Sequence, residues 1–352
     1  MDREDASPFV RGVLPSWVRE GSRLPDELCR KLPMDTVRAA RIAAGVHLAF
    51  RGSATAVELA LTLGQKTTVP APAAPHALVV RRGARTPSAR VLLPALPGEC
   101  VVHVPLPDRA PDEVVKVYLP ETVEVRVDGV VAVGGTLEPG PPQPLWAVYG
   151  DSITQGWSAS EPGLAWPSLV AERLGLDLVN LAFAGAARGE VLAADAVAAS
   201  GAAAVAIAWG TNAWSSLPTD ADAVAQTTRL FLTAVRQGLP QVPLVVVSPL
   251  LRPDAERKKN RFGATHAEMR TAMEAAVRDF ARINGDAQLR LVPGADLVPT
   301  DELADGLHPG DTGHRSLADA VAPAVAEGLG LVATAPDGRH GGTATRHATS
   351  HP

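Results

Sequence analysis

The sequence predicts two folded parts of different class: an all-β sandwich, followed by an α/β part whose parallel sheet is covered by helices on both faces. Three observations lead to this prediction. Up to about residue 137, apolar and polar residues alternate in short runs bounded by turn residues. Residues 138–144 read Glu-Pro-Gly-Pro-Pro-Gln-Pro, which breaks the strand pattern. Beyond them, continuous apolar runs alternate with helix-like stretches.

The first part is expected to contain six or more short strands. The expected strands cover residues 46–51, 57–63, 78–82, 100–104, 114–119 and 123–127. The last of these runs into Asp128-Gly129, a dipeptide typical of a tight hairpin turn, and resumes at residues 130–133. We therefore expect the chain to reverse direction at Asp128-Gly129.

The second part is expected to contain five buried parallel strands. They cover residues 145–149, 176–182, 203–209, 243–248 and 288–292. A helix is predicted over residues 264–283, where Met269, Met273 and Phe280 recur at helical spacing. Because functional groups gather at the carboxyl ends of such strands, the residues that follow each strand are the ones to examine. The expected domains are 1–143, including the proline-rich linker, and 144–332, with a disordered tail at 333–352.

Composition excludes several classes of function. Of the 352 residues 46% are apolar and 20% charged, which is enough apolar material for real cores. The net charge of −5 provides no basic footprint for nucleic acid. No signal peptide and no membrane-spanning stretch is visible, so a cytoplasmic, bacterial, arginine-rich protein is expected without a membrane partner. Cys29 and Cys100 are expected to be free thiols, and whether they lie close in space is left open, as is the oligomeric state.

The first strand of the second part runs directly into Gly150-Asp151-Ser152. Glycine permits a sharp turn there, which would expose the Ser152 hydroxyl at a strand-to-helix junction. The alternative is that the serine or aspartate only caps the helix that follows.

The next two strands end near Gly185 and at Gly210-Thr211-Asn212. Taken alone, these are turn and loop-capping residues. Together with Ser152, however, they supply a backbone N–H and a side-chain amide that can converge on a developing oxyanion. The pattern therefore favours acyl transfer.

Asp305-Gly306-Leu307-His308 follows the last strand. A serine becomes a good nucleophile when an imidazole takes its proton, and a carboxylate holds that imidazole in the required tautomer. Asp305 and His308 lie three residues apart, so one turn can present both. The alternative is a capping aspartate and a surface histidine.

A metal site is the competing interpretation of this segment. Asp305, His308, Asp311 and His314 lie within ten residues, and all are metal-ligand types. Against it, no HExxH pattern accompanies them, and Gly310-Asp311 resembles the start of a helix that runs toward Gly328. No metal and no cofactor are expected.

The four motifs, in this order, resemble the sequence blocks of the SGNH/GDSL hydrolases over about residues 145–331. The resemblance implies a flavodoxin-like three-layer α/β/α domain and serine esterase or acyltransferase chemistry. It makes Ser152 the nucleophile and first oxyanion donor, Gly185 and Asn212 the other donors, and His308 the base with Asp305 as its partner. Many members have an aspartate after the third-block asparagine, where this chain has Ala213.

The β-rich first part resembles the sandwich or jelly-roll domain that precedes the catalytic domain in some carbohydrate esterases and acyltransferases. Those relatives suggest that it shapes one wall of the substrate pocket; the alternative is a stabilising or sugar-binding appendage. The implied partners are a small acyl ester or thioester and, for transfer, an alcohol. Hydrolysis and transfer both remain open. A metal-dependent hydrolase using Asp305, His308 and His314 and a non-catalytic carbohydrate-binding protein are the two competing functions.

Tryptophans are concentrated near these motifs in a chain that is otherwise poor in aromatic residues. We expect Trp146, Trp166 and Trp209 to lie in the core. Trp157 and Trp214 follow loop motifs, and we expect them to form a pocket wall against a flat acyl group or a sugar. The sixth is Trp17.

Overall fold

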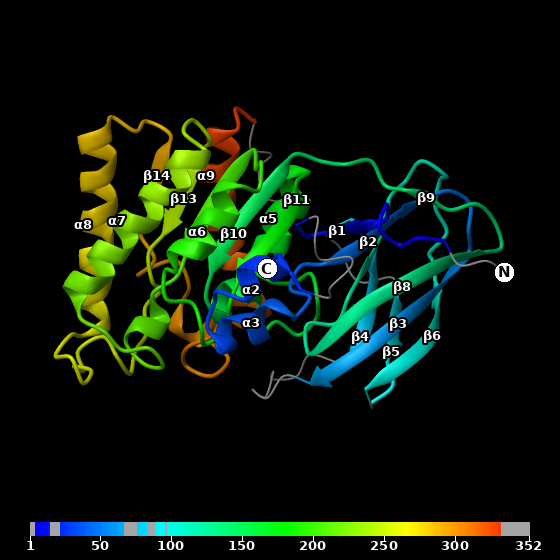
Figure 1. Cartoon of the computed structure of the whole chain (residues 1–352), viewed down its shortest axis with the longest axis horizontal. Helices are drawn as coiled ribbons and strands as arrows, with labels where there is room; N and C mark the ends of the chain where they lie inside the picture. Colours follow the sequence, from blue (N-terminus) through cyan, green and yellow to red (C-terminus); the bar gives the residue numbers. More distant parts are fainter. Residues whose placement is uncertain (1–3, 15–21, 67–75, 84–88, 96, 332–352) are drawn as a thin grey trace, which may run out of the picture.

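The computed structural model describes residues 4–14, 22–66, 76–83, 89–95 and 97–331. Its β-rich part and its α/β part lie side by side along the long axis of the molecule (Figure 1). Trp17 and the expected tail at 333–352 fall outside the described residues. Within them, no helix has the length and apolar character needed to cross a membrane.

The first part is an antiparallel β-sandwich, as predicted. One sheet has the strand order β1 (Val10–Arg11), β2 (His47–Arg51), β7 (Val115–Tyr118), β4 (Ala77–Arg81) and β5 (Ala89–Leu92). The other has the order β6 (Gly98–Pro105), β3 (Ala56–Lys66) and β8 (Val123–Val133). Alternate residues such as Val57, Leu59 and Leu61 point into a shared core that also contains Leu48 and Val117.

The predicted hairpin at Asp128-Gly129 is wrong. β8 continues through these residues and pairs with β3 along its whole length, with a register shift where Ala60 faces Gly129 and Leu61 faces Val127. This shift is a β-bulge, which accommodates one extra residue and bends the strand without reversing it. The turn dipeptide suits a bulge as well as a hairpin, and the long partner strand β3 decided between them.

The proline-rich linker also pairs briefly with the sandwich. Glu138 and Pro139 form β9 (Glu138–Pro139), which pairs with Arg51 and Phe50 of β2. The sequence pattern suggested that no ladder would form here. Proline is tolerated because β9 is an edge strand of two residues, where a missing N–H donor costs little.

The second part is a five-stranded parallel sheet with helices on both faces. The strand order is β11 (Asp177–Ala182), β10 (Leu145–Gly150), β12 (Ala204–Ala208), β13 (Leu244–Val247) and β14 (Leu289–Val292). This is the flavodoxin-like order, with its topological switch point between β10 and β12. The predicted strands and fold class are confirmed.

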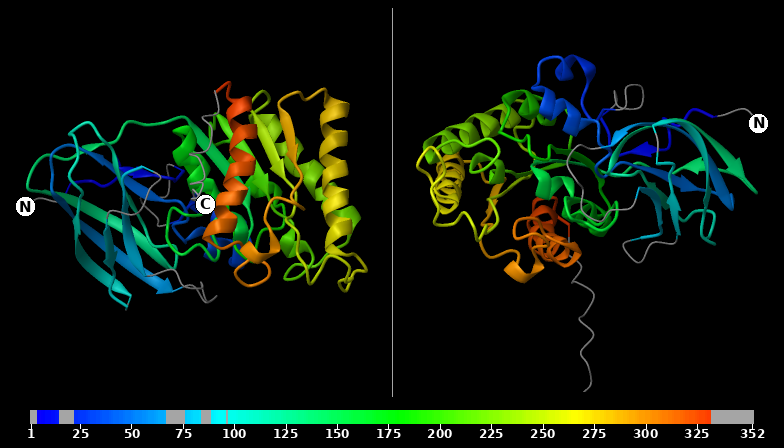
Figure 2. Two further views of the ribbon diagram at one scale, coloured as in Figure 1. Left: turned by 180° about the vertical axis from the view of Figure 1, so that it is seen from behind. Right: turned by 90° about the horizontal axis from the view of Figure 1, so that it is seen from below.

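Each face of this sheet has its own apolar core. On one face pack α6 (Val191–Ala198), α7 (Ala221–Gly238) and α8 (His266–Asn284). On the other pack α5 (Trp166–Leu174) and α9 (Asp311–Gly328). The right-hand view of Figure 2 shows α9 on the opposite side of the sheet from the N-terminal helices.

Those helices, α2 (Asp26–Cys29) and α3 (Met34–Ala40), lie on the α/β part although they precede the sandwich strands. Leu24, Leu32 and Val37 are buried in the core that α6, α7 and α8 share. Arg23 is fully buried and donates to the carbonyl of Ala182 in β11 at 2.7 Å, and burial lowers its pKa to about 9. The N-terminal segment therefore links the two parts, while the domain boundary at 143/144 stays a prediction.

Candidate active site

The turn after β10 places Ser152 at the edge of the sheet. A Cβ on Gly150 would lie 2.3 Å from Thr154 Oγ1 and 2.4 Å from the Ala208 carbonyl oxygen. The close approach of α4 (Ser152–Gln155) and β12 to this position therefore requires glycine here. Asp151 caps α4, because its side chain accepts the Ile153 N–H at 3.1 Å. The capping alternative thus holds for Asp151. Ser152 is the first helical residue, and its N–H has no acceptor within the helix.

Ser152, His308 and Asp305 form a chain of hydrogen bonds. Ser152 Oγ lies 2.8 Å from His308 Nε2, and His308 Nδ1 lies 2.8 Å from Asp305 Oδ2. A carboxylate at Nδ1 favours the tautomer in which Nδ1–H donates to Asp305, which leaves Nε2 to accept the Ser152 hydroxyl proton. Asp305 Oδ1 also accepts the backbone N–H groups of Leu307 and His308, so the loop holds its own carboxylate in place.

The surroundings of His308 favour the neutral form of its imidazole. Burial lowers the pKa of His308, Asp305 opposes the change by hydrogen bonding, and the charge of Arg252 lowers the pKa further. For Asp305, burial favours the neutral form, but the hydrogen bonds from His308 outweigh it and the pKa is lowered. An unprotonated imidazole beside an ionised carboxylate can take a proton from serine.

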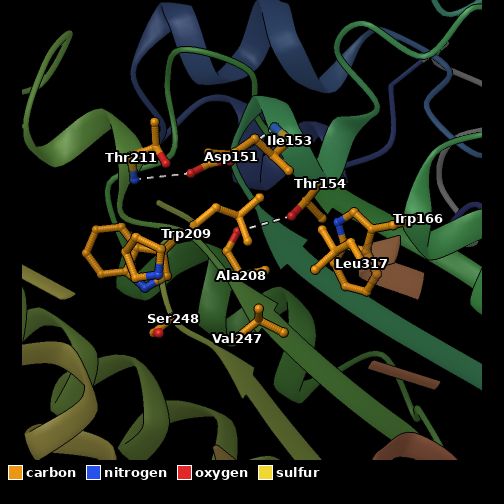
Figure 3. Close-up of a pocket in the computed structure, with 12 residues that line it drawn as sticks. Asp151, Ile153, Thr154, Trp166, Ala208, Trp209, Thr211, Val247, Ser248 and Leu317 are labelled. Carbon is orange, nitrogen blue, oxygen red and sulfur yellow. Dashed lines mark hydrogen bonds between the residues drawn. The ribbon is translucent and has the colours of Figure 1, made fainter. Parts of the chain in front are cut away.

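The residues predicted as oxyanion donors lie on loops that are bonded to this turn. Gly185 has φ +70°, a conformation that favours glycine, and the preceding Ala184 N–H donates to Gln155 Oε1 of α4 at 2.8 Å. Asn212 lies in η1 (Thr211–Ala213), where the Thr211 N–H donates to Asp151 Oδ2 at 3.3 Å (Figure 3). The ends of β10, β11 and β12 are thereby tied together at one edge of the sheet.

Asp151 is central to this arrangement. Burial raises its pKa to about 6, although backbone hydrogen bonds from Ile153 and Thr211 favour the ionised form. Asp151 also lines a cavity of about 20 Å³, and Figure 3 shows the residues around this cavity. That volume is on the order of what one water molecule occupies. The cavity is therefore too small for a substrate.

Ser216 touches both of the other predicted donors. Its hydroxyl lies 3.3 Å from the Gly185 carbonyl oxygen and 3.3 Å from Asn212 Oδ1. Asn212 Nδ2 donates to the Ala187 carbonyl at 3.3 Å. These contacts hold the Asn212 amide in place. They do so in a protein that has Ala213 at the position where many SGNH/GDSL hydrolases carry an aspartate. Sequence analysis did not identify Ser216, because a serine in a loop gives no signal.

The structure separates the tryptophans as predicted into core and loop residues. Trp146, Trp166 and Trp209 are buried, which confirms the core prediction. The Trp157 ring lies beside the His308 ring, with centroids 5.8 Å apart. Trp214 instead packs under Arg252, whose guanidinium lies 4.8 Å from its ring, and donates its indole N–H to the Lys258 carbonyl at 2.8 Å. A pocket role for Trp157 and Trp214 stays a prediction.

The loop that carries Trp157 is held from several sides. Ser158 has φ +69°, a strained conformation for a residue other than glycine. Ser160 donates its N–H and its hydroxyl to Asp311, at 2.8 and 2.6 Å. Glu161 is buried and pairs with Arg81 at 2.9 Å and with Arg90, both from the sandwich. Sequence analysis missed this ion pair because its partners lie 71 or more residues apart.

His314 is a structural residue of α9. It is fully buried, and its Nδ1 accepts the Trp166 N–H while its Nε2 contacts the Trp157 carbonyl, both at 3.3 Å. Burial lowers its pKa to about 4. In the part of the chain that the structure describes, no group of three or more histidine, cysteine or acidic residues is arranged to hold a metal, so the arrangement does not support a metal site built from Asp305, His308 and His314.

Comparisons with known proteins identify the family of the α/β part. The family model described as GDSL-like lipase/acylhydrolase matches residues 144–326. A search of curated protein sequences gave no significant match.

Several solved structures resemble most of the molecule, across both of its parts. A salicylyl-acyltransferase, SsfX3, from a tetracycline biosynthetic pathway shares 24% identity at a TM-score of 0.78, covering 92% of this chain and 95% of that one. A putative GDSL-like lipase from Bacteroides ovatus shares 20% identity at 0.76, with 93% and 97% covered. A family two carbohydrate esterase from Clostridium thermocellum shares 16% identity at 0.61, with 82% and 93% covered.

These likenesses show that the sandwich and the α/β part occur together, in the same order, in other proteins. Family membership rests on the sequence match, which covers more than half of the 352 residues. The chain belongs to the GDSL-like lipase/acylhydrolase family and is a serine esterase or acyltransferase of that family.

Proposed function

We propose that Ser152, His308 and Asp305 form the catalytic triad of this enzyme and that it works through an acyl-enzyme intermediate. The observation that carries this proposal is the pair of 2.8 Å contacts from Ser152 Oγ to His308 Nε2 and from His308 Nδ1 to Asp305 Oδ2. The Ser152 N–H, the Gly185 N–H and the Asn212 amide act as oxyanion donors.

The reaction follows from this geometry. His308 Nε2 takes the Ser152 proton as Oγ attacks the acyl carbonyl, and the oxyanion donors stabilise the tetrahedral intermediate. The imidazolium then protonates the leaving group, and acyl-Ser152 remains. Water or an alcohol attacks the acyl-enzyme in turn, with His308 again as base. Asp305 stabilises the imidazolium in both halves of the reaction.

The substrates are small acyl esters or thioesters, with an acyl group carried to or from a sugar or another alcohol. Two structural neighbours, a salicylyl-acyltransferase and a family two carbohydrate esterase, support this class. The Trp157 ring beside His308 supports a flat acyl group or a sugar as the bound species.

The proposal is tested by labelling with a fluorophosphonate followed by peptide mass spectrometry. We expect one adduct, on Ser152, and expect Ser152→Ala to lose both the adduct and turnover of p-nitrophenyl acetate. Ser53→Ala, in the sandwich, is the matched control and keeps both. Full activity of Ser152→Ala would overturn the proposal, and binding of oligosaccharides without any labelling would favour a non-catalytic carbohydrate-binding protein.

A further inference from the structure

A basic loop joins β13 to α8. Arg257, Lys258, Lys259 and Arg261 lie within five positions, and the loop holds two of the five lysines of a chain with net charge −5. All four residues are exposed to solvent. Among the described residues, none of the four forms a salt bridge, whereas the neighbouring Arg252 pairs with Asp254 at 2.9 Å. Lys259 also acts on Glu268, whose pKa its charge lowers, and the exposed positive charge of the loop is available to a ligand.

This loop is anchored beside the active site. The Lys258 carbonyl accepts the Trp214 indole N–H at 2.8 Å, and Asn260 Nδ2 donates to the Thr219 carbonyl at 2.8 Å. Both contacts join the loop to the segment that follows Asn212. Arg252, at the start of the loop, is near enough to His308 for its charge to lower the pKa of the imidazole.

A groove runs between this loop and the oxyanion-donor loops. Its volume is about 450 Å³, and Arg188 and Arg261 line it together with Ala187, Ala213 and Ser216. Ala187 and Ser216 are direct hydrogen-bond partners of Asn212. Arg188 is paired with Asp35, while Arg261 lies 5.1 Å from the ring of Phe262, which is 53% exposed. No carboxylate is found among the described residues that line the groove.

We propose that this basic loop binds the phosphate groups of the acyl donor, and that the donor is an acyl thioester of a phosphorylated nucleotide. The inference rests on the proposed function and specifies its substrate. Arginine and lysine side chains pair well with phosphate oxygens, and the exposed Phe262 ring offers a surface for a flat base. A neutral ester or a sugar would gain little from these exposed cations, none of which forms a salt bridge among the described residues. In this arrangement the arm that joins the phosphates to the thioester runs from Arg261 along the groove to Ala187 and Ser216, the hydrogen-bond partners of Asn212.

The chemical step balances with the groups present. Ser152 Oγ forms a bond to the thioester carbonyl carbon as His308 takes its proton, and the carbon–sulfur bond breaks. The thiolate leaves with the proton from His308, so the products are acyl-Ser152 and the free thiol. No oxidant or further reactant is needed.

The test compares two thioesters of the same acid, benzoyl-coenzyme A and benzoyl-N-acetylcysteamine, which lacks the phosphates and the base. We expect Lys258→Glu with Arg261→Glu to lower kcat/KM for benzoyl-coenzyme A by about 10- to 100-fold, mainly through KM, because charge reversal replaces attraction by repulsion. For the N-acetylcysteamine thioester, kcat/KM of this variant stays within about twofold of the value for the unaltered protein. Raised ionic strength lowers kcat/KM for the coenzyme A ester alone.

The matched control is Arg278→Glu with Arg282→Glu, which makes the same change in net charge further along α8 and leaves both thioesters unaffected. Equal kcat/KM for the two thioesters, with no effect of the loop variant, would overturn this inference while leaving the triad intact. The inference would also be overturned if the enzyme accepted the benzoyl group only as a thioester of a carrier protein. Failure of both thioesters together with absence of Ser152 labelling would instead reject the proposed function.

Discussion

The two parts of the molecule contribute to the candidate active site in different ways. The α/β part supplies Ser152, Gly185 and Asn212 from the carboxyl ends of three adjacent parallel strands, β10, β11 and β12. The antiparallel sandwich reaches the site through Arg81 and Arg90, which hold Glu161 on the Trp157 loop. A parallel sheet collects its strand ends at one edge, whereas an antiparallel sheet distributes them over two. The α/β part therefore carries the candidate catalytic residues, and the sandwich holds the loop beside them.

The interface between the parts allows this difference to be tested. Besides the Glu161 contacts, Lys116 of β7 pairs with Glu172 of α5. Gly163 lies flat on the Tyr118 ring, where a Cβ would be 3.1 Å from the ring carbon Cζ. Glu161 lies in the loop beside His308, whereas Glu172 lies in α5, so the two acidic residues separate loop placement from simple cohesion of the parts.

The largest expected effect comes from the α/β part. Asn212→Ala should lower kcat by about 10²- to 10³-fold with little change in KM, because the donor acts on charge that develops in the transition state. The measurement is steady-state kinetics on p-nitrophenyl acetate, with thermal unfolding to show that the fold is kept. Asn284→Ala, at the far end of α8, is the control, and a kcat loss under about threefold for Asn212→Ala would remove Asn212 from the oxyanion site.

The next effect tests the sandwich. Glu161→Gln leaves the buried Arg81 without its carboxylate, so we expect a loss of about 3 kcal/mol in the free energy of unfolding and roughly a 10-fold loss in kcat/KM. The kinetic loss should be larger for a bulky acyl ester than for acetate, because the Trp157 loop shifts. Denaturant unfolding and kinetics on a series of acyl esters measure the two quantities.

Glu172→Gln is the matched variant, since it breaks a sandwich pair that does not touch the loop. We expect it to lower stability by about 1 kcal/mol or less, because that pair is partly exposed, and to leave kcat/KM unchanged across the ester series. If both variants changed the acyl preference equally, the sandwich would act only by holding the two parts together.

The pH profile gives a smaller effect. His308 must be unprotonated to act as base, and its pKa lies below the usual 6.5, so kcat/KM should fall as the pH drops through a value below 6.5. Arg252→Ala removes a charge that lowers this pKa, and the acidic limb should therefore move to higher pH. Arg282→Ala serves as control, and an unmoved limb in Arg252→Ala would mean that Arg252 does not reach His308 electrostatically.

The smallest effect concerns Ser216. Its hydroxyl contacts both Gly185 and Asn212 at 3.3 Å, so Ser216→Ala should lower kcat by about threefold, the value of one modest neutral hydrogen bond. Ser215→Ala, one residue away, is the comparison and should have no effect. Equal kcat values for the two variants would show that Ala187 alone suffices to hold Asn212.

Local patterns were enough to predict the elements that carry the candidate catalytic residues. Apolar runs of strand length indicated β10 to β14, and the residues directly after them included Ser152 and Asn212. The loop from Asp305 to His308 was predictable as a unit, because its members lie within four residues. In each case the signal is short in sequence, so no distant partner is needed to interpret it.

Only the tertiary structure decided the rest, because the deciding contacts join residues far apart in the chain. β3 pairs with both halves of β8 and turns Asp128-Gly129 into a bulge. The buried Arg23 binds the β11 carbonyls across more than 150 residues, and Arg81 finds Glu161 across 80. Trp157 and Trp214 look alike in sequence, yet one lies beside His308 and the other under Arg252. The sequence by itself determined the fold class and indicated the candidate reactive groups, because their signals are local, and long-range packing decided how the sandwich holds the loop beside them.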